Sequence, residues 1–307
     1  TTGFAVVSTD NTTGAATPAP KGTITIQGAN GSYKGQVGLA SLETVKTEYA
    51  DFKDTTYAVS GGSFTKAVLP EYCAEGFVPA ANADGTYGVK VAPVAKIGTV
   101  EYATLAEAIA AAKDGDTVTL TADINTPETS YYIQKSLTID LGGKTLTGSG
   151  YDGVFNIEGE NAAVLIKNGK IVAVEQTGTA GKYTMAVWAC AAGCEVTLED
   201  LDVSQQITHT DDKQMDMIYT SNGTIIINSG CFTSGTPAWT LNCKDSAYKA
   251  GTAKIIVNGG TFVGYDPRNN TAEGAGTSFV APGVGVDAVD GSFTAKAGMT
   301  AQIVDAD

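Results

Sequence analysis

Apolar and polar residues recur along this chain in a short pattern that returns about every thirty positions. The pattern is an apolar residue, four mostly small or polar residues that include glycine or asparagine, and a second apolar residue. Its clearest copies are "IIINSGCF" at 225–232 and "IIVNGGTF" at 255–262. A pattern that recurs at a nearly fixed distance is typical of one structural unit used repeatedly.

Five copies follow one another from residue 141 onward. Their first apolar residues are 25, 32, 29 and 30 residues apart, a period that fits the coil of a solenoid. We therefore expect the framing apolar residues to form ladders in the core, with one rung for each coil. These pairs are Leu141 and Leu146, Ile166 and Ile171, Leu198 and Val203, Ile227 and Phe232, and Val257 and Phe262.

A short strand signal precedes each copy, as in "LTIDL" at 137–141 and "TIIIN" at 224–228. These segments are rich in β-branched residues, and the first alternates apolar and polar positions. The Gly-Gly and Asn-Gly pairs that follow suit a tight corner, because glycine and asparagine tolerate positive φ. Strand, corner and second strand in each period predict an all-β, parallel solenoid. The alternative is an antiparallel β-sandwich, although its strands usually return every 8 to 12 residues or so.

The pattern changes near residue 95. Thr104 and Glu107 form a capping box ahead of the helix-forming stretch "LAEAIAAA", which predicts a short helix over 104–113 that ends before Gly115. Such a helix would cover the open end of a first coil. We therefore expect a β-helix domain with a capping helix over 96–307.

Residues before this point form two further regions. A β-rich region is expected over 23–95, with a hairpin turn at "DG", residues 84–85. Residues 1–22 are rich in Thr, Ala and Gly and read as an extended tail or linker. The best strand candidate in the tail is "FAVVS", so we expect its residues to dock as a strand, in this protein or in a neighbouring molecule. This proposed assembly strand consists of Phe4, Ala5, Val6 and Val7.

Two segments resemble a known family. "EYATLAEAIAAAKDGDTVTLTADI" at 101–124 is similar to the start of pectin-lyase-like right-handed parallel β-helix domains of bacterial cell-surface proteins. "VSGGSFTKAVLPEYCAEGFVPAANADGTYGVKV" at 59–91 resembles the segment that often closes such a domain. The resemblance implies a right-handed β-helix, export and a surface role. It does not imply catalysis, because many members carry no lyase site. Here the closing segment precedes the opening one, which departs from the usual order.

Composition and charge agree with an extracellular β-rich protein. Glycine makes up 37 of 307 residues, above the usual proportion of about 7%. The net charge of −14 argues against nucleic acid and anionic membrane surfaces as partners. No apolar run approaches the roughly 18 residues of a membrane span. Because the first residue is Thr1, we expect a processed or trimmed chain.

The five cysteines leave two interpretations open. A secreted protein could form two disulfides and keep one free thiol, with Cys190 and Cys194 as one local pair and Cys231 and Cys243 as the other. Alternatively, some of these cysteines are small buried residues of the core. A zinc site is disfavoured because "CAAGC" lacks the usual two-residue spacing.

Catalytic chemistry has little support in the sequence. The single arginine, Arg268, and the single histidine, His209, lie 59 residues apart with no partner motif, and we expect both in solvated loops. Paired carboxylates for glycoside hydrolysis or calcium could come from "TDDKQMD", but adjacent strand residues point to opposite faces. We predict no catalytic residue, metal or cofactor. The residues weighed for these roles are Asp211, Asp212 and Asp216 as carboxylates, and Trp188 and Trp239 as sugar-stacking platforms.

Three functions remain as hypotheses. The first is a non-catalytic subunit of an extracellular filament, whose copies are joined by the N-terminal strand or by end-to-end stacking of solenoids. The second is a monomeric adhesin or carbohydrate-binding module of a larger surface protein, with host glycans as partners. The third is a polysaccharide lyase or glycoside hydrolase, which the scarcity of His and Arg disfavours.

Overall fold

The computed structural model describes residues 23–26, 32–33, 56–175, 183–207, 215–274 and 276–298. The chain divides into two compact units, Thr1–Ala92 and Pro93–Asp307. The assembly strand proposed at Phe4–Val7 lies outside the described residues.

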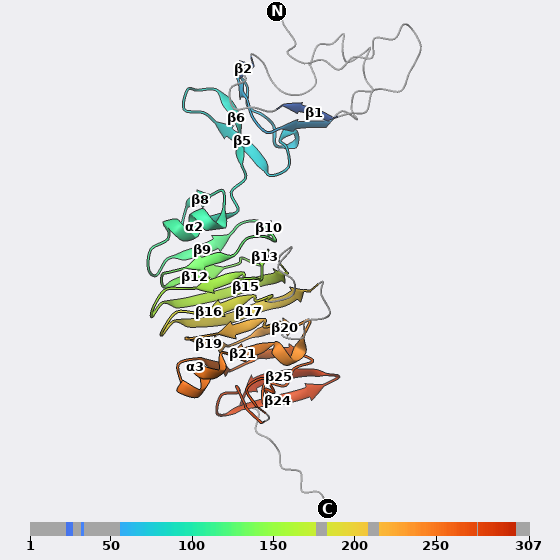
Figure 1. Ribbon diagram of the computed structural model, residues 1–307. Coiled ribbons are helices and arrows are strands. Elements are labelled where there is room, and N and C mark those ends of the chain that lie inside the picture. The colour runs from blue at the N-terminus through green and yellow to red at the C-terminus, as the bar shows by residue number, and fades with distance from the viewer. Residues whose placement is uncertain are drawn as a thin grey trace, which may run out of the picture. The chain divides into compact units, whose positions relative to one another are not determined.

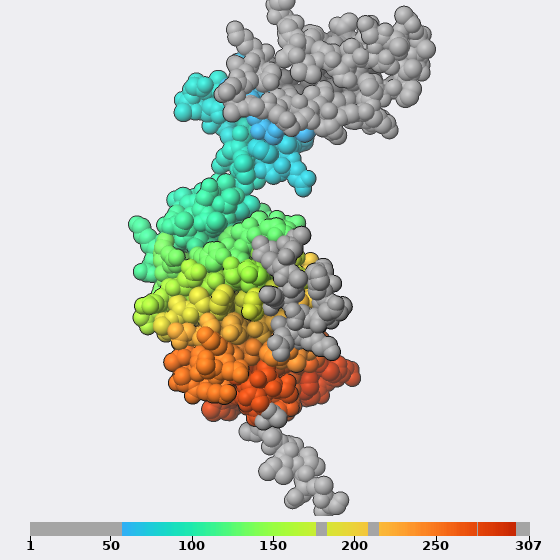
Figure 2. All heavy atoms as spheres, in the orientation of Figure 1, coloured from blue at the N-terminus to red at the C-terminus, as the bar shows by residue number. Residues whose placement is uncertain are grey.

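The second unit is a parallel β-solenoid of about four turns, which confirms the predicted fold class. Successive coils follow one another along its axis, from green to red in Figures 1 and 2. Its larger sheet has fourteen strands, ten of them in parallel ladders. These ten strands are β9 (Thr117–Leu120), β10 (Ile124–Thr126), β12 (Leu137–Asp140), β13 (Thr145–Ser149), β15 (Ala163–Val174), β17 (Glu195–Gln206), β19 (Thr224–Ile227), β20 (Gly230–Thr233), β22 (Lys254–Val257) and β23 (Gly260–Val263).

A second sheet of five parallel strands completes each coil. Hydrogen-bonded neighbours in this sheet come from successive coils, so each strand lies one coil further along the axis. The strands in order are β11 (Tyr131–Ile133), β14 (Phe155–Ile157), β16 (Val187–Ala189), β18 (Ile218–Thr220) and β21 (Leu241–Cys243).

All ten framing residues of the repeated pattern have an exposed fraction of 0%. The structure aligns most of them into two ladders. In the second ladder, Phe232 and Phe262 stack with ring centroids 5.1 Å apart and planes inclined by 14°. The first ladder is Ile166, Leu198, Ile227 and Val257, and the second is Leu146, Ile171, Val203, Phe232 and Phe262.

The first corner departs from the predicted register. Leu141 is buried, but Ile139 rather than Leu141 pairs with Ile166 in the ladder. The cause is the corner itself, which is two residues longer here than in later coils. Gly142 and Gly143 take φ values of 58° and 73° and accommodate the extra length.

The ends of the large sheet are antiparallel. β7 (Ala95–Ile97) pairs with β8 (Val100–Tyr102) at one end, and β25 (Ser292–Ala297) pairs with β24 (Val284–Val289) at the other. Helix α2 (Leu105–Ala111) packs near the first end and carries the predicted capping box. It ends earlier than expected, at the C-cap Ala112 rather than before Gly115.

A second helix, α3 (Asp245–Ala250), was not expected from the sequence. It is short and follows β21 directly. Asp245 lies in its first turn, and Gly251 ends it in the left-handed conformation with φ of 75°. These two residues are ordinary helix-end signals, but six helical residues are too few to show an apolar period.

The first unit contains two pairs of parallel strands, as in two stacked coils, and an antiparallel hairpin that follows them. β1 (Thr23–Ile26) pairs in parallel with β3 (Thr56–Val59), and β2 (Ser32–Tyr33) pairs in parallel with β4 (Ser63–Phe64). The expected hairpin is present as β5 (Phe77–Ala81) and β6 (Tyr87–Val91), with Gly85 at φ of 82° in the turn.

This unit ends as the solenoid of the second unit ends. Phe64 faces Tyr87 in an antiparallel pair, just as Phe262 faces Phe293. In both units, a glycine-containing corner leads into the last parallel strand. An antiparallel hairpin then pairs with that strand. The short 3-10 helix η2 (Pro70–Tyr72) lies between coil and hairpin in the first unit.

Neither of the two possible disulfides is formed, since all five cysteines are free. Cys231 and Cys243 belong to different sheets, and their side chains point apart. Cys243 is buried inside, whereas Cys231 alternates with the buried Phe232 and faces outward. Cys190 donates instead to the side chain of Asn156, with Sγ 3.0 Å from Oδ1. Cys194 and Cys243 are buried, as the alternative interpretation expects of some of the cysteines.

Candidate functional site

The five-stranded sheet presents one row of side chains outward. Each strand has three residues, of which the first and third are buried, so the middle residue points away from the core. Parallel pairing then places the five middle residues side by side across the sheet. This row is Tyr132, Asn156, Trp188, Tyr219 and Asn242.

Aromatic rings dominate the row. Trp188 and Tyr219 lie on neighbouring strands with ring centroids 6.2 Å apart. The indole Nε1 of Trp188 donates to Oγ of Ser221 at 3.0 Å, which fixes the ring and leaves its surface half-exposed. Tyr132 is 45% exposed at the N-terminal end of the row. Between Tyr132 and Trp188, the short side chain of Asn156 is recessed and buried.

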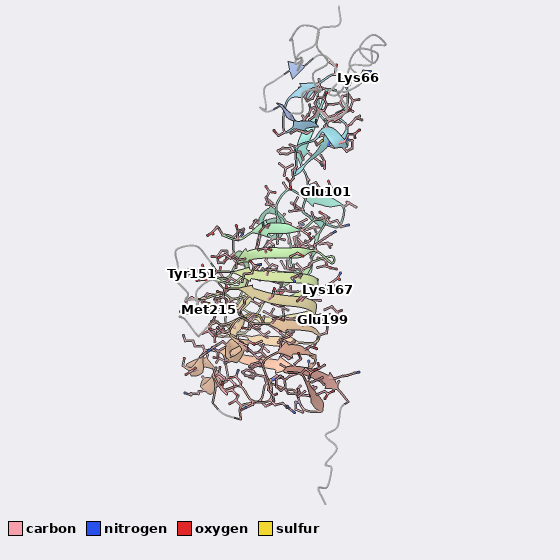
Figure 3. The ribbon with its side chains drawn as sticks, turned by 90° about the vertical axis from the view of Figure 1, so that its right-hand side faces the viewer. Lys66, Glu101, Tyr151, Lys167, Glu199 and Met215 are labelled. Carbon is pink, nitrogen blue, oxygen red and sulfur yellow. The ribbon has the colours of Figure 1, made fainter. Side chains whose placement is uncertain are left out.

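Two further tyrosines come from the turns that precede the strands. Tyr151 precedes β14, and Tyr183, 46% exposed, precedes β16. Their rings meet edge to face with centroids 6.2 Å apart. In Figure 3, Tyr151 and Met215 lie on the side of the solenoid opposite Lys167 and Glu199. We call these five rings the aromatic face, which consists of Tyr132, Tyr151, Tyr183, Trp188 and Tyr219.

The C-terminal end of the row carries hydrogen-bond acceptors. Asp216 is 8% exposed and accepts from Nδ2 of Asn242 at 2.9 Å. Asn242 is 7% exposed, and its Oδ1 is buried without a hydrogen-bond partner. Glu273 accepts from the backbone N–H of Cys243 at 2.8 Å and so covers the free edge of β21. We call Asp216, Asn242 and Glu273 the acceptor cluster.

Burial governs the ionisation of this cluster. It raises the pKa of Asp216 to about 7, and the nearby charge of Glu273 adds to the rise. Burial also raises the pKa of Glu273. The pKa of Tyr219 rises to about 12 through burial and the charges around it, including Asp216 and Glu273. The cluster therefore disfavours further negative charge.

Gln205 on β17 holds the turn that carries Asp216. Its Nε2 lies within hydrogen-bond distance of the carbonyls of Thr184, Met215 and Asp216, at 2.8, 3.0 and 3.2 Å. Its Oε1 accepts from the Ser234 hydroxyl at 2.7 Å. Because the side chain is bonded at both ends, it fixes the turns before β16 and β18 relative to each other.

A cavity of ≈ 290 Å³ lies at the N-terminal end of the row. Helix α2 contributes Ala106 and Ile109 to its wall, and β11 contributes Tyr131 and Tyr132. Lys135, also in the wall, donates to the carbonyls of Ala110 and Ala112 at the C-terminal end of the helix. This lysine is thereby committed to capping the helix.

The residues weighed for chemistry are dispersed. Arg268 is bound to Asp266, with Nη2 2.8 Å from Oδ2, in an exposed loop. Trp239 ends the 3-10 helix η3 (Pro237–Trp239) in the turn before β21, where its carbonyl accepts from the N–H of Met217, the residue after Asp216. His209, Asp211 and Asp212 lie outside the described residues. Trp188 and Asp216 are the two that the structure brings to this site.

Sequence reasoning missed Asn242 and Glu273. Both are single polar residues in segments without a motif, and they meet Asp216 only through the stacking of coils. The alternation of "LNC" in β21 could have placed Asn242 outward, but only once the strand was known.

The described residues contain neither a candidate metal cluster nor a membrane-spanning helix. No group of three His, Cys, Asp or Glu side chains within these ranges is placed to hold a metal ion. None of the helices found there is long and apolar enough to cross a membrane.

Comparison of the chain with protein-family models, with curated proteins and with solved structures gave no match.

Proposed function

We propose that this chain is a non-catalytic part of an extracellular bacterial surface protein that binds carbohydrate on the aromatic face. The observation that carries the proposal is the alignment of Trp188 and Tyr219 on neighbouring strands, with Tyr132 in the same row two strands away from Trp188. Aromatic rings supply flat, amphipathic surfaces that suit the apolar faces of sugar rings. The parallel β-helix of the pectin-lyase-like resemblance supports the surface role.

The spacing of the sheet supports an extended ligand. Parallel strands lie about 4.8 Å apart, close to the length of one pyranose residue in an extended chain. A saccharide lying along the solenoid axis would therefore meet a new outward side chain with nearly every sugar. The recess at Asn156 and the raised rings on either side give such a chain a fixed register.

Replacing Trp188 by alanine should weaken saccharide binding at least about tenfold, because a stacking platform is lost. The measurement is binding of the full chain to an array of immobilised oligosaccharides, followed by calorimetry on those bound. Tyr87→Ala, which removes an exposed aromatic ring from the first unit, is the control. Unchanged binding in Trp188→Ala, with folding verified by circular dichroism, contradicts the proposal.

A non-catalytic role is part of the proposal. Incubation of the bound oligosaccharides with the protein should give no shortened or unsaturated products. Appearance of such products that depends on Asp216 would instead favour a hydrolase, since a buried acid with a raised pKa can act as a proton donor.

Filament assembly is a second candidate, and the exposed sheet edges favour it. β24 is an edge strand whose last residue, Val289, is 60% exposed, and Val100 on β8 is 55% exposed at the opposite end. An exposed edge with apolar side chains can accept a strand from another molecule. Copies of the same chain are the proposed partners, with "FAVVS" as the donated strand.

Deletion of residues 1–22 tests this second candidate. The shortened chain should keep the circular dichroism of a β-solenoid but form no polymer, because it lacks the donor strand. Electron microscopy and light scattering on both chains give the answer. Polymers that persist after the deletion exclude strand donation by this segment, and a full-length chain that stays near 31.4 kDa excludes the filament altogether.

A further inference from the structure

We infer that the aromatic face selects saccharides that carry free amino groups over neutral ones and rejects saccharides that carry carboxylates. This inference rests on the proposed function and adds the charge class of its ligand. It follows from the charges and the hydrogen-bonding groups that border the five rings.

Carboxylates border the aromatic face at both ends. Asp152 accepts from the hydroxyl of Tyr132 at 3.0 Å. Glu158 accepts from Gln134 at 3.3 Å, and its charge contributes to a raised pKa of Tyr132. Glu273 lies at the other end, in the acceptor cluster, whereas the neighbouring Asp216, with a pKa of about 7, is largely protonated at about pH 6. A ligand on this face therefore lies in a negative potential.

The basic groups among the described residues do little to offset these carboxylates. Lys135 is committed to the carbonyls of helix α2, and Arg268 is paired with Asp266. Lys249 lowers the pKa of Glu273, but Asp245 acts on the same carboxyl in the opposite sense and more strongly. An anionic sugar would find little counter-charge on the described residues of this face.

The hydrogen-bonding groups of the acceptor cluster also favour an amine. Oδ1 of Asn242 lacks a donor, and the carboxyl of Glu273 accepts hydrogen bonds. An ammonium donates three hydrogen bonds and accepts none, whereas a carboxylate only accepts. Glu273 is half-buried, so its carboxyl can make direct contact with a ligand.

Calorimetry with three oligosaccharides tests the inference. All three share an extended β-1,4-linked glucose backbone, which is straight enough to follow the row: cellopentaose, the corresponding glucosamine pentamer, and the pentamer oxidised to glucuronate. At about pH 6 the amines are protonated. We expect the glucosamine pentamer to bind about tenfold more tightly than cellopentaose, and the glucuronate pentamer at least about tenfold more weakly. Both differences should shrink at about 1 M salt.

Charge-removing variants locate the effect. Glu273→Gln keeps an oxygen for the Cys243 N–H, and Asp152→Asn keeps one for the Tyr132 hydroxyl. The double variant should bring the affinities of the three pentamers close together. Glu199→Gln also removes one negative charge, but on the opposite side of the solenoid (Figure 3), and should leave the preference intact.

The outcomes separate the inference from the proposed function. Equal affinity for the three pentamers, or preference for the glucuronate pentamer, overturns the charge selection and leaves carbohydrate binding standing. If the double variant keeps the preference for the glucosamine pentamer, the preference comes from other groups, and the inference is overturned as well. Absence of binding to all three pentamers overturns the proposed function for this face.

Discussion

Replacing Phe232 by alanine should lower the free energy of unfolding of the solenoid by about 3 to 5 kcal/mol. Phe232 has an exposed fraction of 0% and forms a rung between Val203 and Phe262. Its ring stacks on that of Phe262. The substitution therefore removes a large buried side chain and leaves a cavity that the stacked coils above and below cannot easily fill.

Urea unfolding followed by circular dichroism gives the measurement. Val263→Ala on the adjacent strand is the control, because this side chain is 38% exposed and its loss should cost less than about 1 kcal/mol. A similarly small loss in Phe232→Ala would contradict the core position of the ladder. Each coil contacts only its neighbours, so a solenoid can unfold in several transitions. Unfolding free energies of variant and parent are therefore compared only where both unfold in one transition.

The stability of the second unit should fall as pH rises between about 4 and 7, through Asp216. Its pKa is raised from the ordinary 3.8 to about 7 in the folded protein, where it is 8% exposed. Below about pH 4 the carboxyl is protonated in both states, so the folded state carries no cost for burying a charged carboxylate. Between the two pKa values the folded state holds a proton that the unfolded state has released, so stability declines with pH.

The expected loss is large because the shift is large. Three pKa units correspond to about 4 kcal/mol at about pH 8, as an upper value. Asp216→Asn cannot ionise and keeps an oxygen for Nδ2 of Asn242. The difference in unfolding free energy between the variant and the parent should therefore grow from about pH 4 to about pH 7 and then level off. A difference that stays constant over this range would contradict a buried, protonated Asp216.

Much of the fold could be predicted because the solenoid repeats. Each coil places apolar residues at equivalent positions, so Ile227, Phe232, Val257 and Phe262 make the same pattern visible several times. Because the pattern recurs in several coils, an irregular residue in one copy does not hide it. The closing hairpin at 77–91 was also predictable, since Asp-Gly between two strand signals is a strong local turn.

The rest depends on information that local patterns do not contain. The extra length of the corner at Gly142 and Gly143 moved the ladder from Leu141 to Ile139, which only the neighbouring strand reveals. The three residues of the acceptor cluster lie on three different coils, between 26 and 57 positions apart in sequence. Their proximity comes from stacking. Trp188 was recognised as a candidate because its residue type alone suggested a stacking platform.

A closing hairpin ends each of the two units. In each unit the hairpin reverses the direction of pairing after the last parallel strand, at Phe64 with Tyr87 and at Phe262 with Phe293. Every sheet in the described residues draws its strands from one unit only. When tension applied to the ends of the chain unfolds one unit, it removes no strand from a sheet of the other unit. The chain should then lengthen in separate steps, one unit at a time.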